Sequence, residues 1–511
     1  MLQYDACPAV CGAMLRGIEK TMKMTDSTET IRKFLEYEEN GDLFDFIVGG
    51  CRIWAYMRFN VYMKIEEMIN DQNKRESKND HFGFREICRI IRNCTISNPQ
   101  LRAKQKDYLI VTHARRTLVD GSYECLYTDE LAAKLADKAC SAEFIYGNTH
   151  MMPAKTRGLL YLDYIDIFPV LQKFKKKQYD AEIKQIRQRF KEIRKEISEC
   201  FGVELSEAFL VNTAVKRFLW YQLKKPYLKK LVKKIRPKAI IEVVSYETNK
   251  MLLNEVAYEL GIPTVELQHG VIGRGHAAYN YLRKHDYSYF PQYVFLFSEF
   301  WKRTAGFAQS EDRLIPVGYP YLERMMSRYP MADADPSGTL HILVLSQPEY
   351  SVKLLRDVEK LVGMLEESGM NYRLLYKLHP AEYRMDNSAF DNIRANQNVE
   401  VIATPDISLY ELFPRCQIQI GVTSTAIFEG LAYELKTLIL HYEKTDLYMG
   451  DLCRNHYATM CESERELFEN VVSYQRKEDA AGEHIRELFF VRNALENMTA
   501  ELKRIEEGNL K

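Results

Sequence analysis

The stretch QIQIGVTSTAIFEGLAYELKTLILHY (residues 417–442) predicts a strand, a helix and a second strand. Residues 417–422 and 437–442 are short apolar runs, and residues 425–435 between them carry apolar side chains at helical spacing. A strand, a helix and a strand joined by short links are typical of a βαβ unit, whose two strands lie parallel in one sheet. The stretch therefore predicts an α/β fold.

The same alternation extends outward along the chain from this unit. In the second half it predicts strands at 339–346, 372–380 and 399–402 and helices at 353–369 and 408–416. In the first half it predicts strands at 107–113, 144–147, 159–165, 239–245, 263–270 and 293–298, a helix at 250–261 and two long helices between 170 and 236. We therefore expect two Rossmann-like domains, each with a parallel sheet covered by helices.

The chain is expected to divide into four parts. Residues 31–39 and 53–69 space their apolar side chains at three and four, which predicts helices before the first sheet. The stretch 316–338 carries four prolines and marks the link between the two domains. The four parts are a helical N-terminal extension (1–100), a first Rossmann-like domain with long basic helices (101–320), a second Rossmann-like domain (321–480) and a C-terminal helix (481–511).

The composition excludes several classes of protein. Of the 511 residues, 46% are hydrophobic and 28% are charged, which is typical of a folded chain with a sizeable core. Lys plus Arg and Asp plus Glu each number 71, so no overall basic footprint indicates a nucleic-acid partner. We expect no transmembrane helix and no secretory signal, and the 11 scattered cysteines favour a reducing cytoplasm.

The first motif with chemical potential is LQHGVIGRGHAAY (267–279). His269 and Gly270 end a predicted strand, and Gly273 and Gly275 permit close approaches that a side chain would block. A histidine at a strand end beside a glycine turn suits a proton acceptor or an anion contact. The alternative is a histidine with a purely local role in its loop.

The second motif, YKLHPAEY (376–383), closes a strand of the second domain. Lys377, His379 and Pro380 stand at the strand end, where the proline stops the sheet. The imidazole would face the gap between the domains and contact a phosphate or a base. The alternative is that His379 merely caps the turn.

The third motif, GVTSTAIFEG (421–430), joins a strand to a helix. Thr423, Ser424 and Thr425 stand at the helix start, where hydroxyls and free N–H groups bind phosphate well. Glu429 lies about one turn further along and would accept hydrogen bonds from ribose hydroxyls. The alternative is an ordinary N-cap with a solvated glutamate.

The fourth feature is a basic region over residues 173–236. Residues 216–236 hold nine Lys or Arg and no acid, with apolar side chains at helical spacing. Such a region is either a solvated helix face or a patch for an anionic membrane surface or polyanionic acceptor.

The ordered set of His269-Gly270, His379-Pro380 and Thr423-Ser424-Thr425 resembles the motifs of bacterial glycosyltransferases with the GT-B fold. More narrowly, it is similar to enzymes of capsule and surface-polysaccharide assembly that use CMP-sugar or CDP-glycerol donors. The resemblance covers about residues 240–445, including the joining segment 298–320. It implies a cytoplasmic enzyme, peripheral at the inner membrane face, that moves a sugar from a nucleotide donor to a glycan or lipid-linked glycan.

The resemblance also implies roles for individual residues. The second domain would hold the nucleotide through Lys377, His379, Pro380, the 423–425 turn and Glu429. His269 would deprotonate the acceptor, with Asp120 and Glu247 as rival bases. We expect no cofactor and no metal.

The sequence departs from this family in two respects. It lacks the paired acidic residues of one sialic-acid polymerase family, and it reads Thr-Ser-Thr where the glycerol-phosphate enzymes have Tyr-Ser-Ser, so the donor stays open. Two other functions compete. One is a UDP-N-acetylglucosamine 2-epimerase, which would need further carboxylates between the domains. The other is a non-catalytic assembly scaffold on the same fold.

Overall fold

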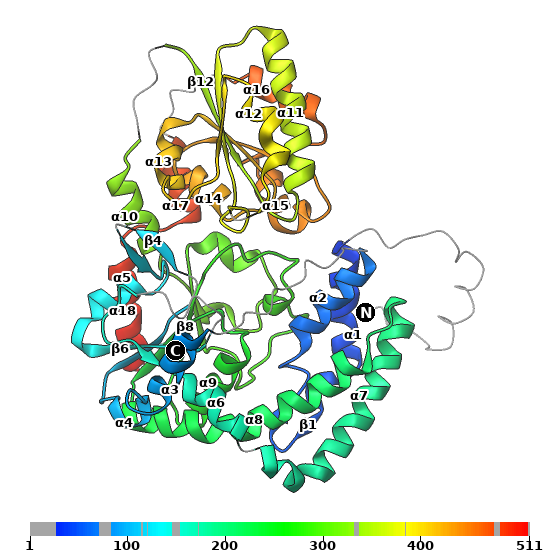
Figure 1. Cartoon of the computed structure of the whole chain (residues 1–511), viewed down its shortest axis with the longest axis vertical. Helices are drawn as coiled ribbons and strands as arrows, with labels where there is room; N and C mark the ends of the chain where they lie inside the picture. The colour runs from blue at the N-terminus through cyan, green and yellow to red at the C-terminus, as the bar shows by residue number, and fades with distance from the viewer. Residues whose placement is uncertain are drawn as a thin grey trace, which may run out of the picture.

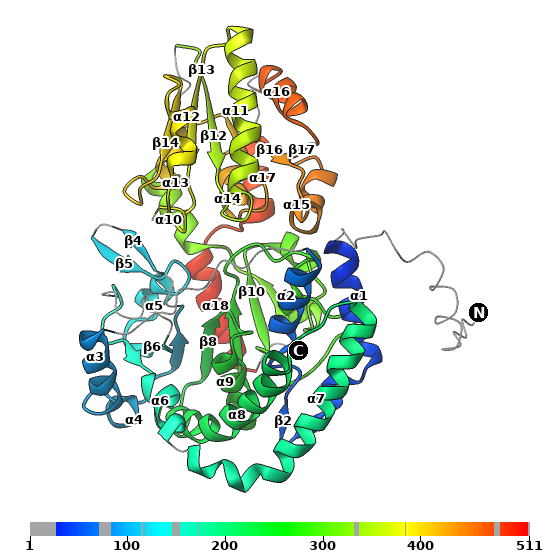
Figure 2. The same cartoon turned by 45° about the vertical axis from the view of Figure 1, so that its right-hand side comes forward.

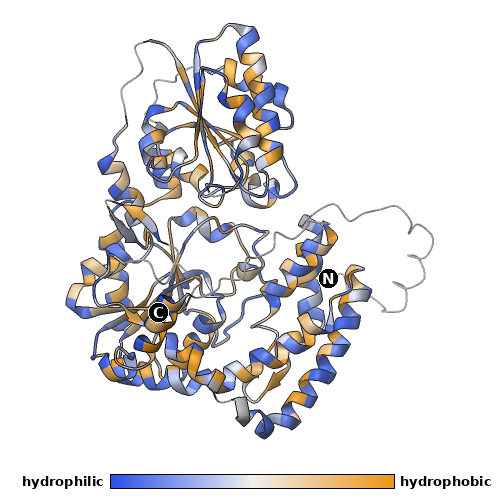
Figure 3. Ribbon diagram, in the orientation of Figure 1, coloured by the Kyte–Doolittle hydropathy of each residue, from blue (hydrophilic) through white to orange (hydrophobic). Residues whose placement is uncertain are grey.

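The computed structural model of the chain describes residues 27–70, 83–113, 116–119, 121–145, 154–171, 173–331, 337–383, 385–474 and 481–508. These residues form two lobes stacked along the long axis of the molecule, each with a parallel sheet at its centre (Figure 1). Apolar strands run through the middle of both lobes, and hydrophilic residues gather on the outer helices (Figure 3).

The first lobe contains a seven-stranded parallel sheet in the order β11-β10-β9-β8-β3-β6-β7. Its strands are β3 (Tyr108–Val111), β6 (Ala139–Glu143), β7 (Leu160–Tyr161), β8 (Ala239–Val243), β9 (Thr264–Leu267), β10 (Tyr293–Leu296) and β11 (Leu314–Pro316). Every residue of β3, β8 and β9 is buried, because helices cover both faces. Strand order reverses between β3 and β8, which opens a crevice at their carboxyl ends.

The second lobe contains a six-stranded parallel sheet in the order β14-β13-β12-β15-β16-β17. Its strands are β12 (Leu340–Leu345), β13 (Tyr372–Lys377), β14 (Val399–Ile402), β15 (Ile418–Gly421), β16 (Lys436–Leu440) and β17 (Thr459–Cys461). The order reverses between β12 and β15, as in dinucleotide-binding sheets. The predicted α/β class with two Rossmann-like parallel sheets is confirmed.

Helices cover both sheets. In the first lobe they are α5 (Asp129–Leu135), α6 (Asp163–Leu171), α7 (Asp180–Phe201), α8 (Glu207–Ile235) and α9 (Thr248–Glu259), with a short hairpin of β4 (Thr117–Val119) and β5 (Ser122–Glu124). In the second lobe they are α11 (Ser351–Ser368), α12 (Asp391–Arg394), α13 (Leu409–Leu412), α14 (Ala426–Ala432), α15 (Thr445–Arg454) and α16 (Glu464–Val472).

The described part of the N-terminal extension is mainly helical. Its elements are α1 (Ser27–Asn40), β1 (Ile47–Val48), β2 (Cys51–Arg52), α2 (Arg58–Ile69), α3 (Phe84–Cys94) and α4 (Pro99–Arg102). The helix predicted from residue 53 begins at Arg58 instead, because residues 53–57 form turns with buried side chains.

Two strand predictions in the first lobe are wrong. Residues 144–147 were expected as a strand, but the strand here is β6, which ends at Glu143, and residues 144–145 lie in no strand. Residues 146–147 lie outside the described residues. The β6 sequence ACSAE carries small and polar side chains, so it shows no apolar run. The strand expected at 159–165 is confined to Leu160–Tyr161, because α6 begins at Asp163.

The end of the chain ties the two lobes together. α10 (Pro320–Arg328) leads into the second lobe, and residues 481–508 form two helices, α17 (Ala481–Phe489) and α18 (Ala494–Glu506), where one was expected. α18 returns to the first lobe and buries Met498, Leu502 and Ile505 beside β8 (Figure 2). The buried indole of Trp301 donates to the carbonyl of Phe489 at 3.0 Å.

Many apolar side chains of the basic region at residues 173–236 lie in the core, whereas basic side chains such as Lys216, Lys230 and Lys233 are exposed. Leu228, Leu231, Val232 and Ile235 of α8 are fully buried, so they do not form an exposed apolar face. Lys224 is buried, and its Nζ lies 2.6 Å from Oδ1 of Asp166. Two further lysines of α8 pair with Glu259. The part of the chain that the structure describes includes no helix that is both long and apolar enough to cross a bilayer.

Candidate active site

The loops that follow the strands of the two sheets meet between the lobes. The backbone N–H of Val271, after β9, donates to Oγ1 of Thr425, after β15, at 3.2 Å. The N–H of Arg274 donates to the carbonyl of Leu447 in α15 at 3.1 Å. The carboxyl ends of both sheets therefore face one gap, where ligands of such sheets bind.

The three glycines of the first motif make this approach possible. A Cβ at Gly270 would lie 3.2 Å from Oγ1 of Thr425, and one at Gly273 would lie 2.8 Å from the carbonyl oxygen of Leu447. A Cβ at Gly275 would lie 3.0 Å from Cδ1 of the same leucine. Side chains at these positions would crowd the contact between the lobes.

His269 lies half-buried at the end of β9 among three tyrosine rings. The ring centroids of Tyr127, Tyr246 and Tyr279 lie 6.2, 6.1 and 6.2 Å from that of the imidazole. Nδ1 lies 3.5 Å from the hydroxyl oxygen of Tyr279, at the limit of a hydrogen bond. The histidine is thus held by its surroundings and is not a solvated loop residue.

Behind Tyr279 lies a buried carboxylate, Glu266 of β9. Its Oε1 accepts the Tyr279 hydroxyl at 2.6 Å, and Oε2 accepts the Ser245 hydroxyl at 2.6 Å. Burial raises the pKa of Glu266, although its hydrogen bonds to Ser245 and Tyr279 oppose the shift. Burial also raises the pKa of Tyr279 well above its ordinary value, so the tyrosine keeps its proton.

This network orients the imidazole. Because the Tyr279 hydroxyl donates its hydrogen bond to Glu266, its oxygen can only accept a hydrogen bond from His269. That favours a proton on Nδ1 and leaves Nε2 as the nitrogen that accepts one. The role predicted for His269, that of a proton acceptor, requires a nitrogen in this state.

In the second lobe, the predicted turn lies at the strand-order reversal. The Gln347 side chain, after β12, donates to Oγ1 of Thr423 at 2.6 Å and accepts the Thr423 N–H at 3.1 Å. Ser424 Oγ accepts the N–H of Ala426, the first residue of α14, at 3.3 Å, whereas the N-cap residue Thr425 makes no side-chain cap hydrogen bond. Thr425 faces the first lobe instead. Because α14 has only seven residues, the turn itself carries more of the site than the helix dipole.

The second motif lies at the end of β13, two strands from β15. His379 is exposed, and its Nδ1 accepts the N–H of Ala381 at 3.1 Å, so it does cap the turn. The same bond places the imidazole proton on Nε2, which suits donation to a phosphate. Lys377 is buried, donates to the carbonyl of Thr404 at 2.5 Å, and has its pKa lowered to about 8 by burial. Pro380 is exposed at the turn.

Glu429 is not the solvated glutamate of the alternative interpretation. It accepts the Tyr410 hydroxyl at 2.9 Å, and burial raises its pKa to about 7. Nearby, the ring of Tyr319 stacks on Tyr127 with centroids 6.0 Å apart, and Tyr127 contacts His269. A row of aromatic rings therefore runs from His269 on the first lobe toward the second.

The raised pKa of Glu429 predicts a testable pH dependence of stability. The carboxyl has a pKa of about 7 in the folded chain against 4.5 ordinarily, so its stabilising contribution is complete below pH 4.5 and is lost as the pH rises through 7. We expect Glu429→Gln to remove this loss. The difference in the free energy of unfolding between the variant and the wild type should favour the variant by about 2 kcal/mol more at pH 8 than at pH 5, as measured by urea unfolding. Glu299→Gln, at a glutamate that is 71% exposed, is the control. Equal pH slopes in the wild type and Glu429→Gln would contradict the shift.

Of the two alternative bases, Asp120 and Glu247, the structure describes only Glu247. Asp120 lies outside the described residues. Glu247 follows β8, and its Oε2 lies 3.0 Å from Nζ of the buried Lys250. Val244, three residues before Glu247, has a φ of +60°, which is strained for a β-branched residue. Among the residues that the structure describes, no group of three or more His, Cys, Asp or Glu could hold a metal ion.

Sequence reasoning missed Glu266, Tyr279, Tyr127 and Gln347. The first of these carried a readable signal, since a lone glutamate in an otherwise apolar buried strand needs a partner. The others depend on contacts between distant segments.

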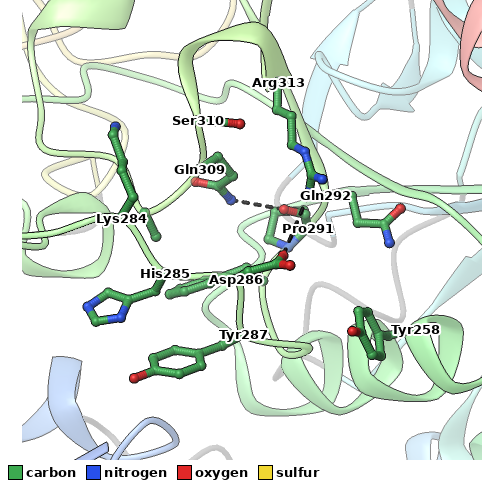
Figure 4. Close-up of a pocket in the computed structure, with 12 residues that line it drawn as sticks. Tyr258, Lys284, His285, Asp286, Tyr287, Pro291, Gln292, Gln309, Ser310 and Arg313 are labelled. Carbon is green, nitrogen blue, oxygen red and sulfur yellow. Dashed lines mark hydrogen bonds and ion pairs between the residues drawn. The ribbon is translucent and has the colours of Figure 1, made fainter. Parts of the chain in front are cut away.

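A pocket of about 310 Å³ opens elsewhere on the first lobe, lined by residues such as Tyr258, Lys284, Gln309 and Arg313 (Figure 4). Its residues precede β9, β10 and β11, so it lies at the amino ends of these strands. It is therefore separate from the site between the lobes.

No protein-family model matches the sequence, and no curated protein matches it. Solved structures with a similar fold include the UDP-GlcNAc 2-epimerase of Methanocaldococcus jannaschii, at 11% identity and a TM-score of 0.45 over 78% of this chain and 98% of that one. The spinosyn rhamnosyltransferase SpnG is 12% identical over 79% and 99%, with a TM-score of 0.41. The α,α-trehalose 6-phosphate synthase of Burkholderia multivorans is 10% identical over 79% and 98%, with a TM-score of 0.43.

Proposed function

We propose that this protein is a glycosyltransferase of the GT-B type that moves a sugar from a nucleotide-activated donor, of the CMP or CDP class, to a glycan or lipid-linked glycan of a surface polysaccharide. One observation carries the proposal. The loop of His269 contacts the turn at Thr425, so a proton acceptor on one lobe adjoins a phosphate-type turn on the other.

The reaction follows from this placement. Nε2 of His269 removes the proton of the acceptor hydroxyl as its oxygen attacks the anomeric carbon. The bond from that carbon to the phosphate oxygen breaks, and the nucleotide leaves with the electron pair. Nε2–H of His379 and the 423–425 turn offset the negative charge on the leaving phosphate. Glu429 accepts the ribose hydroxyls in this scheme, and we expect turnover to persist with a chelator.

A nucleotide screen tests the proposal. We expect CMP or CDP at about a hundredfold excess over Kd to raise the free energy of unfolding by about 2.7 kcal/mol, and UDP or GDP to raise it less. Ser424→Ala should weaken this effect, and Ser473→Ala, at a serine outside the site, should not. Stability unchanged by every nucleotide would contradict the proposal and favour the scaffold.

Turnover assays then separate the two enzymatic functions. We expect the matching nucleotide sugar to be consumed only when an acceptor glycan is present. Conversion to a sugar epimer without any acceptor would favour the 2-epimerase, for which Glu266 is a carboxylate that the sequence alone did not indicate.

A further inference from the structure

Helix α3 and the turn after it expose large apolar side chains on the flank of the first lobe. Phe84, Ile87 and Ile91 are 82%, 47% and 57% exposed. They are spaced at three and four, so they share one side of the helix. Ile96 and Leu101 follow, at 65% and 71% exposed. We call these five residues the α3 face. Single exposed apolar residues are ordinary, but five within eighteen positions mark an interaction site.

The opposite side of α3 is anchored to the lobe, so the exposure does not come from a detached helix. Asn93 is buried and donates to Asp163 of α6 at 2.9 Å. Arg89 donates to the Tyr161 hydroxyl at 3.0 Å, and its guanidinium lies 5.2 Å from the centre of that ring. The apolar side of the helix is therefore presented outward on a fixed support.

Basic residues surround this apolar surface. Residues 83–106 contain six Lys or Arg and one acid, Glu86, in a chain whose net charge is zero. Arg85, Arg92 and Arg102 are exposed, and within the described ranges none of the three forms an ion pair with an acidic group. A groove of about 610 Å³ between Arg92, Ser97 and Tyr161 opens beside the helix.

We propose that the α3 face docks the protein on an anionic phospholipid bilayer. Apolar side chains rimmed by arginine complement a surface whose interior is apolar and whose headgroups are negative. Phe84, Ile87 and Ile91 enter the boundary between headgroups and acyl chains. Arg85 and Arg92 contact the lipid phosphates, and the groove takes one headgroup. The basic region at 173–236 is not needed for this docking.

Vesicle sedimentation of the full chain tests the proposal independently of any enzymatic activity. We expect binding to vesicles of equal parts phosphatidylcholine and phosphatidylglycerol, weakened by salt, and little binding to phosphatidylcholine alone. Ile87→Ser with Ile91→Ser should lower the partition coefficient at least about tenfold, and so should Arg85→Glu with Arg92→Glu. Val352→Ser and Arg465→Glu, at residues exposed elsewhere, are the matched controls.

Three outcomes would overturn the proposal. The wild type fails to bind the anionic vesicles, or the two double variants bind as well as the wild type. In the third, the wild type self-associates in sedimentation velocity and the isoleucine variant does not, which assigns the face to a second copy of this chain. All variants alter exposed side chains, so their melting temperatures should equal that of the wild type.

Discussion

Replacing His269 with Asn is expected to lower kcat for sugar transfer by about 10²–10⁴-fold, the range that a general base contributes. The Asn side chain retains a polar contact with Tyr279 but cannot accept a proton at neutral pH. Nucleotide binding should be unchanged, because the donor turn lies on the other lobe. Rates and nucleotide affinity are measured on the same preparation. His484→Asn, at an exposed histidine of α17, serves as the control.

Tyr279→Phe separates positioning from catalysis. Without the tyrosine oxygen, Nδ1 of His269 loses its acceptor and Glu266 loses one of its donors. We expect a smaller loss of kcat, with a displaced acidic limb in the pH profile. Full activity of His269→Asn would refute the role of the imidazole and would direct attention to Glu247 or Asp120. An unchanged pH profile in Tyr279→Phe would refute the orienting role of the tyrosine.

Arg58→Met is expected to lower the free energy of unfolding by about 3–5 kcal/mol. Arg58 and Glu38 are both 2% exposed, and the guanidinium holds the carboxylate through two bonds of 2.8 and 2.7 Å. It also donates to the carbonyl of Asn280 at 3.0 Å and to that of Ala277. Removing the arginine leaves a buried, uncompensated carboxylate.

Two control variants test whether the lost stability comes from the unpaired charge. Arg58→Met combined with Glu38→Leu should recover much of the loss, because neither charge is then left alone. Arg32→Met removes an exposed arginine that bonds Glu29 at 2.9 Å, and it should change the free energy of unfolding far less than Arg58→Met. Urea unfolding at neutral pH measures all three. A small loss in Arg58→Met, similar to that in Arg32→Met, would contradict the argument.

This ion pair gives the N-terminal extension a role near the site. Ala277 and Asn280 belong to the loop that follows His269 and carries Tyr279. The extension therefore braces the loop on which the proposed base depends. Nothing in residues 27–70 suggested this, because an arginine and a glutamate at separate helix positions look like surface residues in a sequence.

The sequence predicted the second lobe better than the first for a physical reason. β12, β13, β15 and β16 are almost wholly buried, so their sequences are rich in apolar residues between turn residues, with few interruptions such as the buried Gln419. In the first lobe β6 is built from small and polar residues, and β7 is only two residues long. Neither produces a pattern that periodicity can detect.

The candidate site was partly predictable as well. Strand-end motifs indicated His269 and the 423–425 turn, because polar residues after parallel strands gather at one edge of a sheet. The stripe of basic and apolar residues in α8 looked like a surface for a partner, whereas Lys224 has its partner inside the fold. The orienting role of Tyr279 depends on its contacts with Glu266 and His269 together, which no local pattern encodes.

The return of α18 to the first lobe has a consequence for biosynthesis. Leu502 and Ile505 cover Ile110 and Ile241 of the first sheet, yet the ribosome adds them only after the whole second sheet has emerged. Until α18 has been synthesised, the central strands of the nascent first lobe therefore expose an apolar surface. That interval is when a chaperone would be needed, and stop codons placed before residue 494 would make the interval permanent.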